Sequence, residues 1–185
     1  MKIIGIAGGS ASGKSTLAFR LTEALSQYRV RLFAMDSYYK PESALPLVTT
    51  VSGRTYRDYN SPDSFDLARM KRDLRACIEE GRFDYILVEG LLTLQDDEIF
   101  GLLDLRVFVD CPADLRIIRR LRRNMAWGLS FDEIADVYLD LVRHRHEEYV
   151  APSVNRAQLV IDSAYGIETG LQELLKNITE MSNAH

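Results

Sequence analysis

The residues best suited to chemistry form a glycine-rich turn at the start of the chain. From Gly8 the sequence reads G-x-x-x-x-G-K-S, closing on Gly13, Lys14 and Ser15. Glycines let a backbone curl so that several N–H groups point at one anion, and a helix beginning near Ser15 adds its positive end. Lys14 can then reach terminal phosphates, and the Ser15 hydroxyl suits a magnesium ion that bridges them. The turn predicts a site for a nucleoside triphosphate with Mg²⁺, formed by Gly8, Gly9, Ser10, Ala11, Ser12, Gly13, Lys14, Ser15 and Thr16.

Two carboxylates directly follow apolar runs that read as strands. Asp36 comes after the run from Val30 to Ala34, and Glu89 comes after the run from Tyr85 to Val88. Parallel sheets bind ligands at the carboxyl ends of their strands, so Asp36 is a candidate base, with a helix cap or turn residue as the alternative. Glu89 is a candidate to polarise the magnesium or its waters, or else a structural residue.

Arginines recur on one face of a helix predicted from Ala113 to about Met125. They are Arg116, Arg119, Arg120 and Arg123, and the other face carries Ile117, Ile118, Leu121 and Met125. We expect the apolar face to pack on the body and the guanidinium groups to point outward. Arginine forks match phosphate oxygens, which favours a lid at about 116–130 over a transferred group. A solvated basic face and a nucleic-acid patch are the alternatives.

A long polar stretch precedes the second predicted helix. Residues 41–62 hold three of the five prolines and no sustained hydrophobic period, which predicts a long loop or a distorted hairpin. Its polar side chains favour a substrate loop, at about 37–62, over a solvated mobile excursion. These side chains belong to Arg54, Tyr56, Arg57, Asp58, Tyr59 and Asn60.

The elements that must position these residues alternate along the chain. Strands are predicted at 2–7, 30–34, 85–88, 105–109 and 158–162, and helices at 15–26, 61–80, 113–125, 132–150 and 167–178. The 61–80 helix should open at Ser61-Pro62-Asp63 and stop at Gly81, and a capping box at Ser130 should start the fourth helix. Such alternation predicts an α/β fold, a five-stranded parallel sheet with helices on both faces. The pattern leaves the order of the strands open.

Composition narrows the class of protein. The chain has 185 residues, of which 46% are hydrophobic and 27% charged, so we expect a single domain over 1–185 with a substantial core. Its net charge of -4 argues against nucleic-acid and membrane-surface partners. Cys77 and Cys111 read as core thiols in a reducing compartment. With no membrane-length apolar run and no room for a signal peptide, the expected location is cytoplasmic.

Several motifs together resemble the uridine kinase and phosphoribulokinase family. The matching segments are residues 8–15, 36–39, 60–66, 88–90, 109–123 and 147–152, spread over nearly the whole chain. The resemblance implies a P-loop kinase fold with a helical lid, and transfer of the γ-phosphoryl of ATP, with Mg²⁺, to a primary hydroxyl. In uridine kinases this is the ribose 5′ oxygen. It further implies Asp36 as catalytic base, Lys14 and Ser15 on the phosphates and metal, Glu89 at the metal, and Arg120 and Arg123 as lid arginines.

The chain departs from that family where an acceptor would be read. Asn60-Ser61-Pro62 stands where uridine kinases usually have Asp-His-Pro, a base-reading hairpin after Gly81 is absent, and 126–129 lacks two further lid arginines. Residues 36–43 are similar to the nicotinamide riboside kinases. The expected substrate-binding residues are Asp36, Tyr38, Tyr39, Arg57, Tyr59 and Asn60.

Three readings of the function therefore remain. The first is a nucleoside kinase, and the second is a kinase of nicotinamide riboside, pantothenate or another hydroxyl metabolite. The third, from a different class, is a nucleotide-switched binding protein, although the guanine-reading N-K-x-D segment is absent. A homo-oligomer is compatible with each of them.

Overall fold

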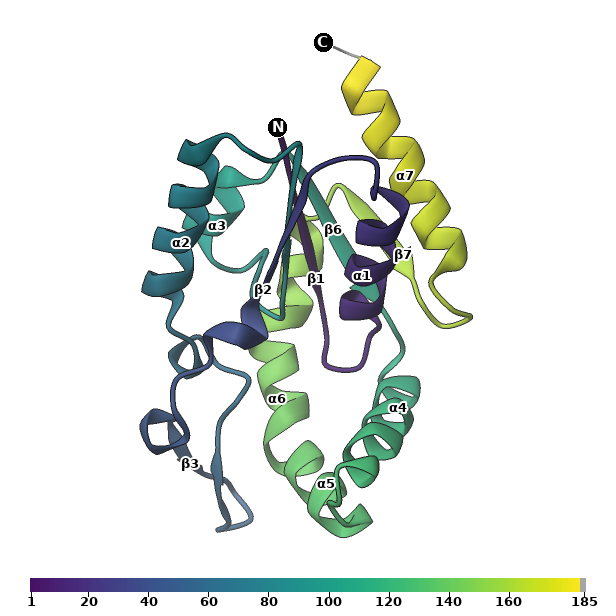
Figure 1. Ribbon diagram of the computed structural model, residues 1–185. Helices are drawn as coiled ribbons and strands as arrows, with labels where there is room; N and C mark the ends of the chain where they lie inside the picture. Colours follow the sequence, from purple (N-terminus) through teal and green to yellow (C-terminus); the bar gives the residue numbers. More distant parts are fainter. Residues whose placement is uncertain (184–185) are drawn as a thin grey trace.

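The computed structural model describes residues 1–183, and within them a parallel sheet has the strand order β2-β5-β1-β6-β7 (Figure 1). Its strands are β1 (Lys2–Gly8), β2 (Val30–Ala34), β5 (Tyr85–Glu89), β6 (Leu105–Asp110) and β7 (Leu159–Asp162). The predicted α/β class and the five strand positions are confirmed. The structure adds the strand order, which places β1 and its glycine-rich turn at the centre of the sheet.

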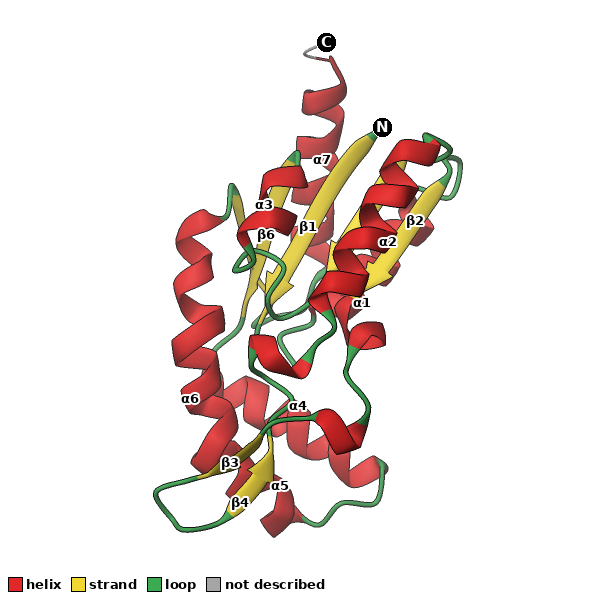
Figure 2. Cartoon of the chain, turned by 90° about the vertical axis from the view of Figure 1, so that its left-hand side faces the viewer, coloured by secondary structure: helices red, strands yellow, loops and turns green. Residues whose placement is uncertain are grey.

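Helices cover both faces of this sheet (Figures 1 and 2). One face packs against α1 (Lys14–Ala24) and α7 (Glu168–Asn183), and the other against α2 (Leu67–Glu80) and α3 (Asp97–Leu102). Successive side chains of a strand point to opposite faces. In β1, Ile4 and Ile6 accordingly join the α1 and α7 core, whereas Ile3 joins the α2 and α3 core. Two apolar cores therefore hold the central strand.

A helical arm lies beyond the carboxyl ends of the strands (Figure 1). It comprises α4 (Ala113–Ala126), α5 (Phe131–Val137), η4 (Tyr138–Val142), α6 (Arg143–Arg145) and η5 (His146–Val150), followed by the 3-10 turn η6 (Ala151–Arg156). The predicted capping box starts α5, because Ser130 Oγ accepts from Glu133 N and the Glu133 carboxylate accepts from Ser130 N. From α5 to η5 the helix is continuous, with wider π-helical turns at η4 and η5.

The predicted substrate loop contains a short antiparallel hairpin opposite the helical arm (Figure 2). Its strands are β3 (Leu47–Thr49) and β4 (Thr55–Arg57), and short 3-10 turns flank it at η1 (Met35–Tyr38), η2 (Glu42–Ala44) and η3 (Pro62–Ser64). The tip of the hairpin is fastened to the arm, since Ser52 Oγ and Tyr56 OH both donate to the Asp140 carboxylate at 2.6 and 3.0 Å.

Two helix predictions need correction. The second helix begins at Leu67, and the proline turn of η3 stands apart from it, because extended Phe65 separates them and the Asp66 side chain caps the helix through Arg69 N. Helix α3 was not predicted, since it is only 6 residues long and too short to show a helical period. No helix in residues 1–183 combines the length and apolarity that a membrane span requires.

Candidate active site

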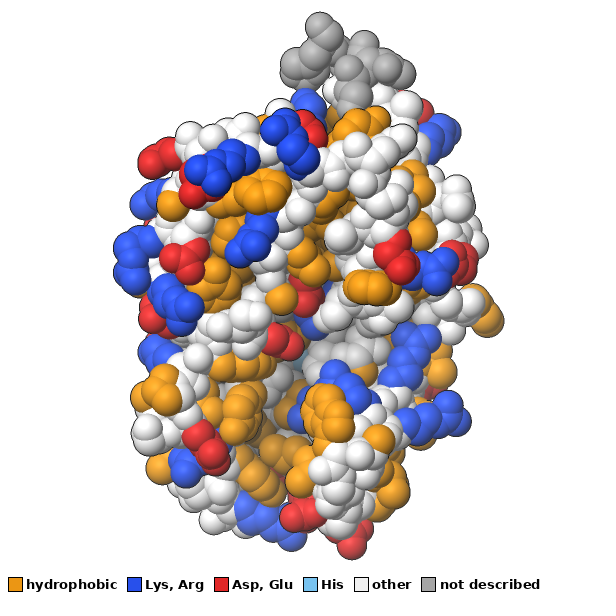
Figure 3. Space-filling model, in the orientation of Figure 1, with side chains coloured by type: hydrophobic (Ala, Val, Ile, Leu, Met, Phe, Trp, Pro, Cys, Tyr) orange, Lys and Arg blue, Asp and Glu red, His pale blue; other side chains and the backbone are white. Residues whose placement is uncertain are grey.

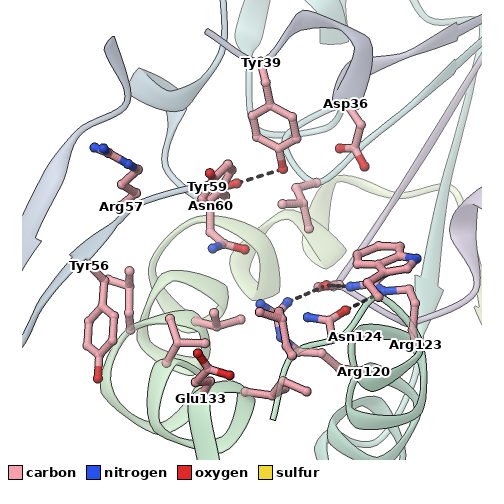
Figure 4. A pocket seen from close by; sticks show the side chains of 18 of the residues that line it. Asp36, Tyr39, Tyr56, Arg57, Tyr59, Asn60, Arg120, Arg123, Asn124 and Glu133 are labelled. Carbon is pink, nitrogen blue, oxygen red and sulfur yellow. Dashed lines mark hydrogen bonds between the residues drawn. The ribbon is translucent and has the colours of Figure 1, made fainter. Parts of the chain in front are cut away.

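A cavity of about 610 Å³ lies at the carboxyl ends of the strands, between the hairpin and the helical arm (Figure 3). It brings together groups that are far apart in the chain (Figure 4). Of the predicted site residues, it is lined by Ser10, Lys14, Ser15, Asp36, Tyr39, Arg57, Tyr59, Asn60, Arg120 and Arg123. A second hollow, of about 470 Å³, adjoins it across Lys14, Ser15 and Arg123, and its walls include Thr16, Arg119 and Ile167.

The glycine-rich turn has a backbone that requires its glycines. Gly13 has φ +100°, and at Gly8 a Cβ atom would lie 2.6 Å from the carbonyl oxygen of Val109. A side chain at Gly8 would therefore collide with the neighbouring strand, and one at Gly13 would strain the start of α1. The turn is also held from behind, because Ser163 Oγ donates to Ser12 O at 2.6 Å.

Three cations converge on the mouth of this turn. Lys14 is only 7% exposed. Arg120 Nη1 and Arg123 Nη2 both donate to Ser10 Oγ, at 3.0 and 3.4 Å. Within residues 1–183 no carboxylate forms an ion pair with any of the three, and Arg120 Nε is buried without a partner. Burial and the neighbouring Arg123 lower the pKa of Arg120. Such a cluster of uncompensated charge calls for a polyanion.

The arginine helix is oriented differently from our expectation. Ile118 and Met125 are 46% and 50% exposed, so the apolar face does not pack on the body as predicted, although Leu121 is buried. The arginine face points inward: Arg116 Nε donates to Cys111 O, and Arg119 Nη2 donates to Ser163 O at 2.8 Å. These guanidinium groups satisfy carbonyl oxygens at the strand ends, a requirement that the amphipathic pattern does not reveal.

The two predicted carboxylates lie next to each other at the sheet edge. Ala34 of β2 pairs with Glu89 of β5, which sets Asp36 just beyond Glu89. The Ser15 hydroxyl donates to both Glu89 oxygens at 3.2 Å. Burial raises the pKa of Glu89, Lys14 opposes the rise, and Asp36 adds to it. Asp36 lines the cavity, and no group in the described chain donates a hydrogen bond to its carboxylate.

Opposite the cations, the cavity wall carries aromatic and amide groups. The Tyr39 ring stacks on Phe65 at 4.4 Å between centroids, and its hydroxyl donates to Tyr59 O at 2.9 Å. Burial, followed by the charge of Asp36, raises the pKa of Tyr39. The Asn60 side chain points into the cavity and has no hydrogen-bond partner in the described chain. Asn60 and Asp36 are therefore both available to a ligand.

One predicted substrate residue lies elsewhere. The Tyr38 hydroxyl donates to Asp73 Oδ2 at 3.1 Å, and its side chain borders a separate surface hollow beside Cys77. Tyr38 is the last residue of the 3-10 turn η1 and Tyr39 follows it, and of the two side chains only that of Tyr39 lines the cavity. We therefore withdraw Tyr38 from the expected substrate contacts.

Sequence reasoning missed the far wall of the cavity and two supporting side chains. The wall comes from the arm and includes Asn124, Trp127, Glu133, Val137 and Leu141, none of which was expected at the site. Neither support has a local sequence signal, because each depends on a contact across more than 80 residues of chain.

The first support is the fully buried carboxylate of Asp58. It accepts from Arg145 Nε at 2.7 Å and from the Asn60 backbone N–H at 2.7 Å, and thereby joins the side of the cavity that carries Asn60 to the arm. The second support is His146, whose ring lies behind Gly9 beside Arg116. Burial and the Arg116 charge lower the pKa of His146 to about 4, against a smaller opposing effect of Asp110.

Comparison with known proteins agrees with this geometry. The model of the Phosphoribulokinase / Uridine kinase family matches residues 82–169. A uridine kinase of Clostridium botulinum (strain Okra / Type B1) is 31% identical over 97% of this chain and 96% of its own length. A uridine kinase of Lactococcus lactis subsp. lactis (strain IL1403) is 31% identical over 98% of this chain and 97% of its own.

Solved structures share the fold at lower sequence identity. A shikimate kinase from Acinetobacter baumannii in complex with shikimate aligns with a TM-score of 0.58 at 16% identity, over 97% of this chain and 94% of that one. A possible uridine kinase from Bacillus stearothermophilus aligns with a TM-score of 0.54 at 20% identity, over 87% and 88%.

A glycine-rich turn at the end of the central strand, a cation cluster and neighbouring carboxylates on this sheet define a P-loop kinase. At 31% identity over nearly its full length, the chain belongs to the phosphoribulokinase and uridine kinase family.

Proposed function

We propose that this kinase transfers the γ-phosphoryl group of ATP to the 5′ hydroxyl of a ribonucleoside in the cytoplasm. One observation carries the proposal: the Asp36 carboxylate and the cations Lys14, Arg120 and Arg123, none of which has an ion-pair partner within residues 1–183, line one cavity. A base for an alcohol thus shares a cavity with a site for transferring phosphate. The identity of the acceptor as a ribonucleoside is supported by relatives named uridine kinase.

The donor fits the turn and the second hollow. The N–H groups of the turn, the α1 N-terminus and Lys14 would bind the phosphates, and the hollow beside Arg119 and Ile167 offers room for the nucleoside part of ATP. Ser15 Oγ and the Glu89 carboxylate, already 3.2 Å apart, would hold Mg²⁺ directly or through water. When bound, Mg²⁺ neutralises charge on the β- and γ-phosphates.

The acceptor would lie between Asp36 and Asn60. Asp36 would orient the 5′ hydroxyl and take its proton, while the Asn60 amide would hold a ribose hydroxyl. Arg120 and Arg123 would stabilise charge on the transferred group. We propose that α4 and α5 act as a lid that excludes water, which would otherwise receive the phosphoryl group.

The test is acceptor-dependent release of ADP. Purified protein with ATP and Mg²⁺ is supplied singly with uridine, cytidine, adenosine, nicotinamide riboside and pantothenate, and products are identified by mass. We expect ADP together with a nucleoside 5′-monophosphate, and little ADP without acceptor. Phosphorylation of pantothenate alone would overturn the nucleoside assignment, and acceptor-independent ADP release would favour a nucleotide-switched binding protein instead.

A further inference from the structure

Two buried asparagine side chains border the cavity. Asn60 belongs to the segment after β4, and Asn124 belongs to α4 (Figure 4). They are 9% and 6% exposed, respectively. Buried amide groups nearly always have hydrogen-bond partners, because leaving one unpaired costs free energy. An amide group at these positions that lacks a partner in the protein therefore implies a partner on a ligand.

Arg123 fixes the orientation of the Asn124 amide. Arg123 Nε donates to Asn124 Oδ1 at 3.0 Å. A guanidinium group carries donors only, so it can bind the oxygen of an amide but not its nitrogen. Asn124 Nδ2 must then point away from Arg123, and Asn124 lines the cavity. Within residues 1–183 this nitrogen, with its two N–H donors, has no hydrogen-bond partner.

Asn124 lies at the part of the cavity that adjoins the phosphate site. It directly follows Arg123 and stands four residues after Arg120, so it shares a face of α4 with Arg120. Both arginines donate to Ser10 Oγ of the glycine-rich turn. An acceptor whose hydroxyl reaches the transferred phosphoryl group brings its adjoining atoms next to this part of α4. In a ribonucleoside those atoms belong to the ribose and not to the base.

We propose that Asn124 binds the acceptor, by donating from Nδ2 to a ribose hydroxyl oxygen. The 2′ and 3′ hydroxyls would then lie between the amides of Asn124 and Asn60. Asn124 would thereby distinguish ribonucleosides from nucleosides that lack one of these hydroxyls. The inference rests on the proposed function, because it takes the acceptor to be a ribonucleoside.

Asn124 also supports Arg123, and the test has to separate the two effects. Arg123 keeps further contacts, since its Nη2 donates to Ser10 Oγ at 3.4 Å and its guanidinium group lies 5.1 Å from the centre of the Trp127 ring. A displaced Arg123 would slow transfer to every acceptor by the same factor. A lost contact to a ribose hydroxyl would affect only acceptors that carry the hydroxyl.

The test compares three acceptors in the parent and in Asn124→Leu, which is similar in size and has no hydrogen-bonding group. The acceptors are uridine, 2′-deoxyuridine and 3′-deoxyuridine, and the measured quantity is the ratio of kcat/KM for uridine to that for each analogue. In the parent we expect at least one ratio of about 10 or more, because removing the hydroxyl leaves a buried donor unpaired. In Asn124→Leu that ratio should fall by about 5-fold or more. Should another ribonucleoside be the better acceptor, its own two deoxy analogues replace those of uridine.

Two further variants serve as controls. Arg122→Leu, an exposed change on the same helix, should keep the parental rate and ratios. Trp127→Ala removes the ring contact of Arg123, so it should lower kcat/KM for the three acceptors equally and leave the ratios unchanged. A fall in the ratios as large in Trp127→Ala as in Asn124→Leu would mean that they report the position of Arg123, and would contradict the proposal. If Asn124→Leu does not fold, Asn124→Ala takes its place with the same expectation.

The outcomes separate this inference from the proposed function. If no ribonucleoside is phosphorylated, the proposed function fails and the inference fails with it. If a ribonucleoside is phosphorylated and Asn124→Leu lowers kcat/KM equally for all three acceptors, only the inference fails. Ratios near 1 for both deoxy analogues in the parent would also overturn the inference alone.

Discussion

The two ends of the cavity are built in different ways. The phosphate end is backbone at the tip of the central strand, fixed between two apolar cores and anchored where Ser163 Oγ donates to Ser12 O. The acceptor end joins a hairpin to a helical arm, largely through surface side chains such as Ser52, Tyr56 and Asp140. The difference implies that the phosphate end is rigid, whereas the acceptor end can open or vary with little cost to the fold.

One buried contact makes the acceptor end less loose than its surface contacts suggest. Asp58 is 0% exposed and bonds both Arg145 of the arm and the backbone of Asn60. A buried carboxylate that lost its partner would be left uncompensated. Asp58 therefore couples the Asn60 side of the cavity to the arm, in addition to the surface contacts of the hairpin tip.

The largest effect on turnover should come from changing Asp36, the proposed base, which lies where the two ends of the cavity meet. Asp36→Asn removes the proposed base but keeps the size and polarity of the side chain. We expect kcat to fall by about 10²- to 10⁴-fold. Steady-state turnover with uridine measures it, and a variant that turns over like the parent would remove Asp36 from this role.

A slightly smaller loss should follow removal of a cation from the phosphate end. Arg120→Ala deletes a guanidinium group that converges with Arg123 on Ser10 Oγ, so we expect kcat to fall by about 10²- to 10³-fold. The exposed Arg122 on the same helix provides the control variant Arg122→Ala, which should keep the parental rate. Equal losses in the two variants would mean that net charge, rather than position, matters.

A change at the acceptor end should have a smaller effect, and it should alter the KM of the acceptor rather than kcat. Asp140→Asn weakens the contacts of Ser52 and Tyr56, so we expect the KM of uridine to rise about 5-fold, with the KM of ATP unchanged. Glu147→Gln, an exposed change on the same helical run, is the control and should have no effect. If the KM of ATP rises instead, the two ends are not separate.

The smallest expected effect is on the folding stability of the protein, and it comes from His146, whose ring lies behind the glycine-rich turn. The pKa of His146, about 4, lies below the value of about 6.5 in an unfolded chain. Between these values the unfolded chain binds more protons, so this histidine lowers the stability as the pH falls from 6.5 to 4. Arg116 opposes its protonation and Asp110 favours it.

Melting temperatures between pH 7 and pH 4 test this effect. His146→Gln, which stays neutral, should lose less thermal stability over that range than the parent. The exposed His144→Gln in the same helical run should follow the parental curve. Parallel curves for all three proteins would contradict a half-buried His146 that stays neutral in the folded protein.

The sequence predicted the phosphate end better than the acceptor end, for a physical reason. The glycine turn, Asp36 and Glu89 were identified because each is marked by its immediate neighbours in the chain. The inward face of the arginine helix was misassigned, since carbonyl oxygens of Cys111 and Ser163 decide it. The far wall of the cavity and the contact between Asp58 and Arg145 were not predicted, because both depend on how the arm folds back toward the rest of the chain.

The account assigns ATP binding to the phosphate end and not to Asp36, and measuring ATP affinity in two variants side by side tests this most directly. Titration calorimetry with ATP and Mg²⁺ should show about a 10- to 100-fold weaker affinity for Lys14→Ala, because a charge-assisted contact is lost. The same titration should give Asp36→Asn the parental affinity, although its kcat is strongly reduced. Parental ATP affinity in Lys14→Ala, or its loss in Asp36→Asn, would contradict the account.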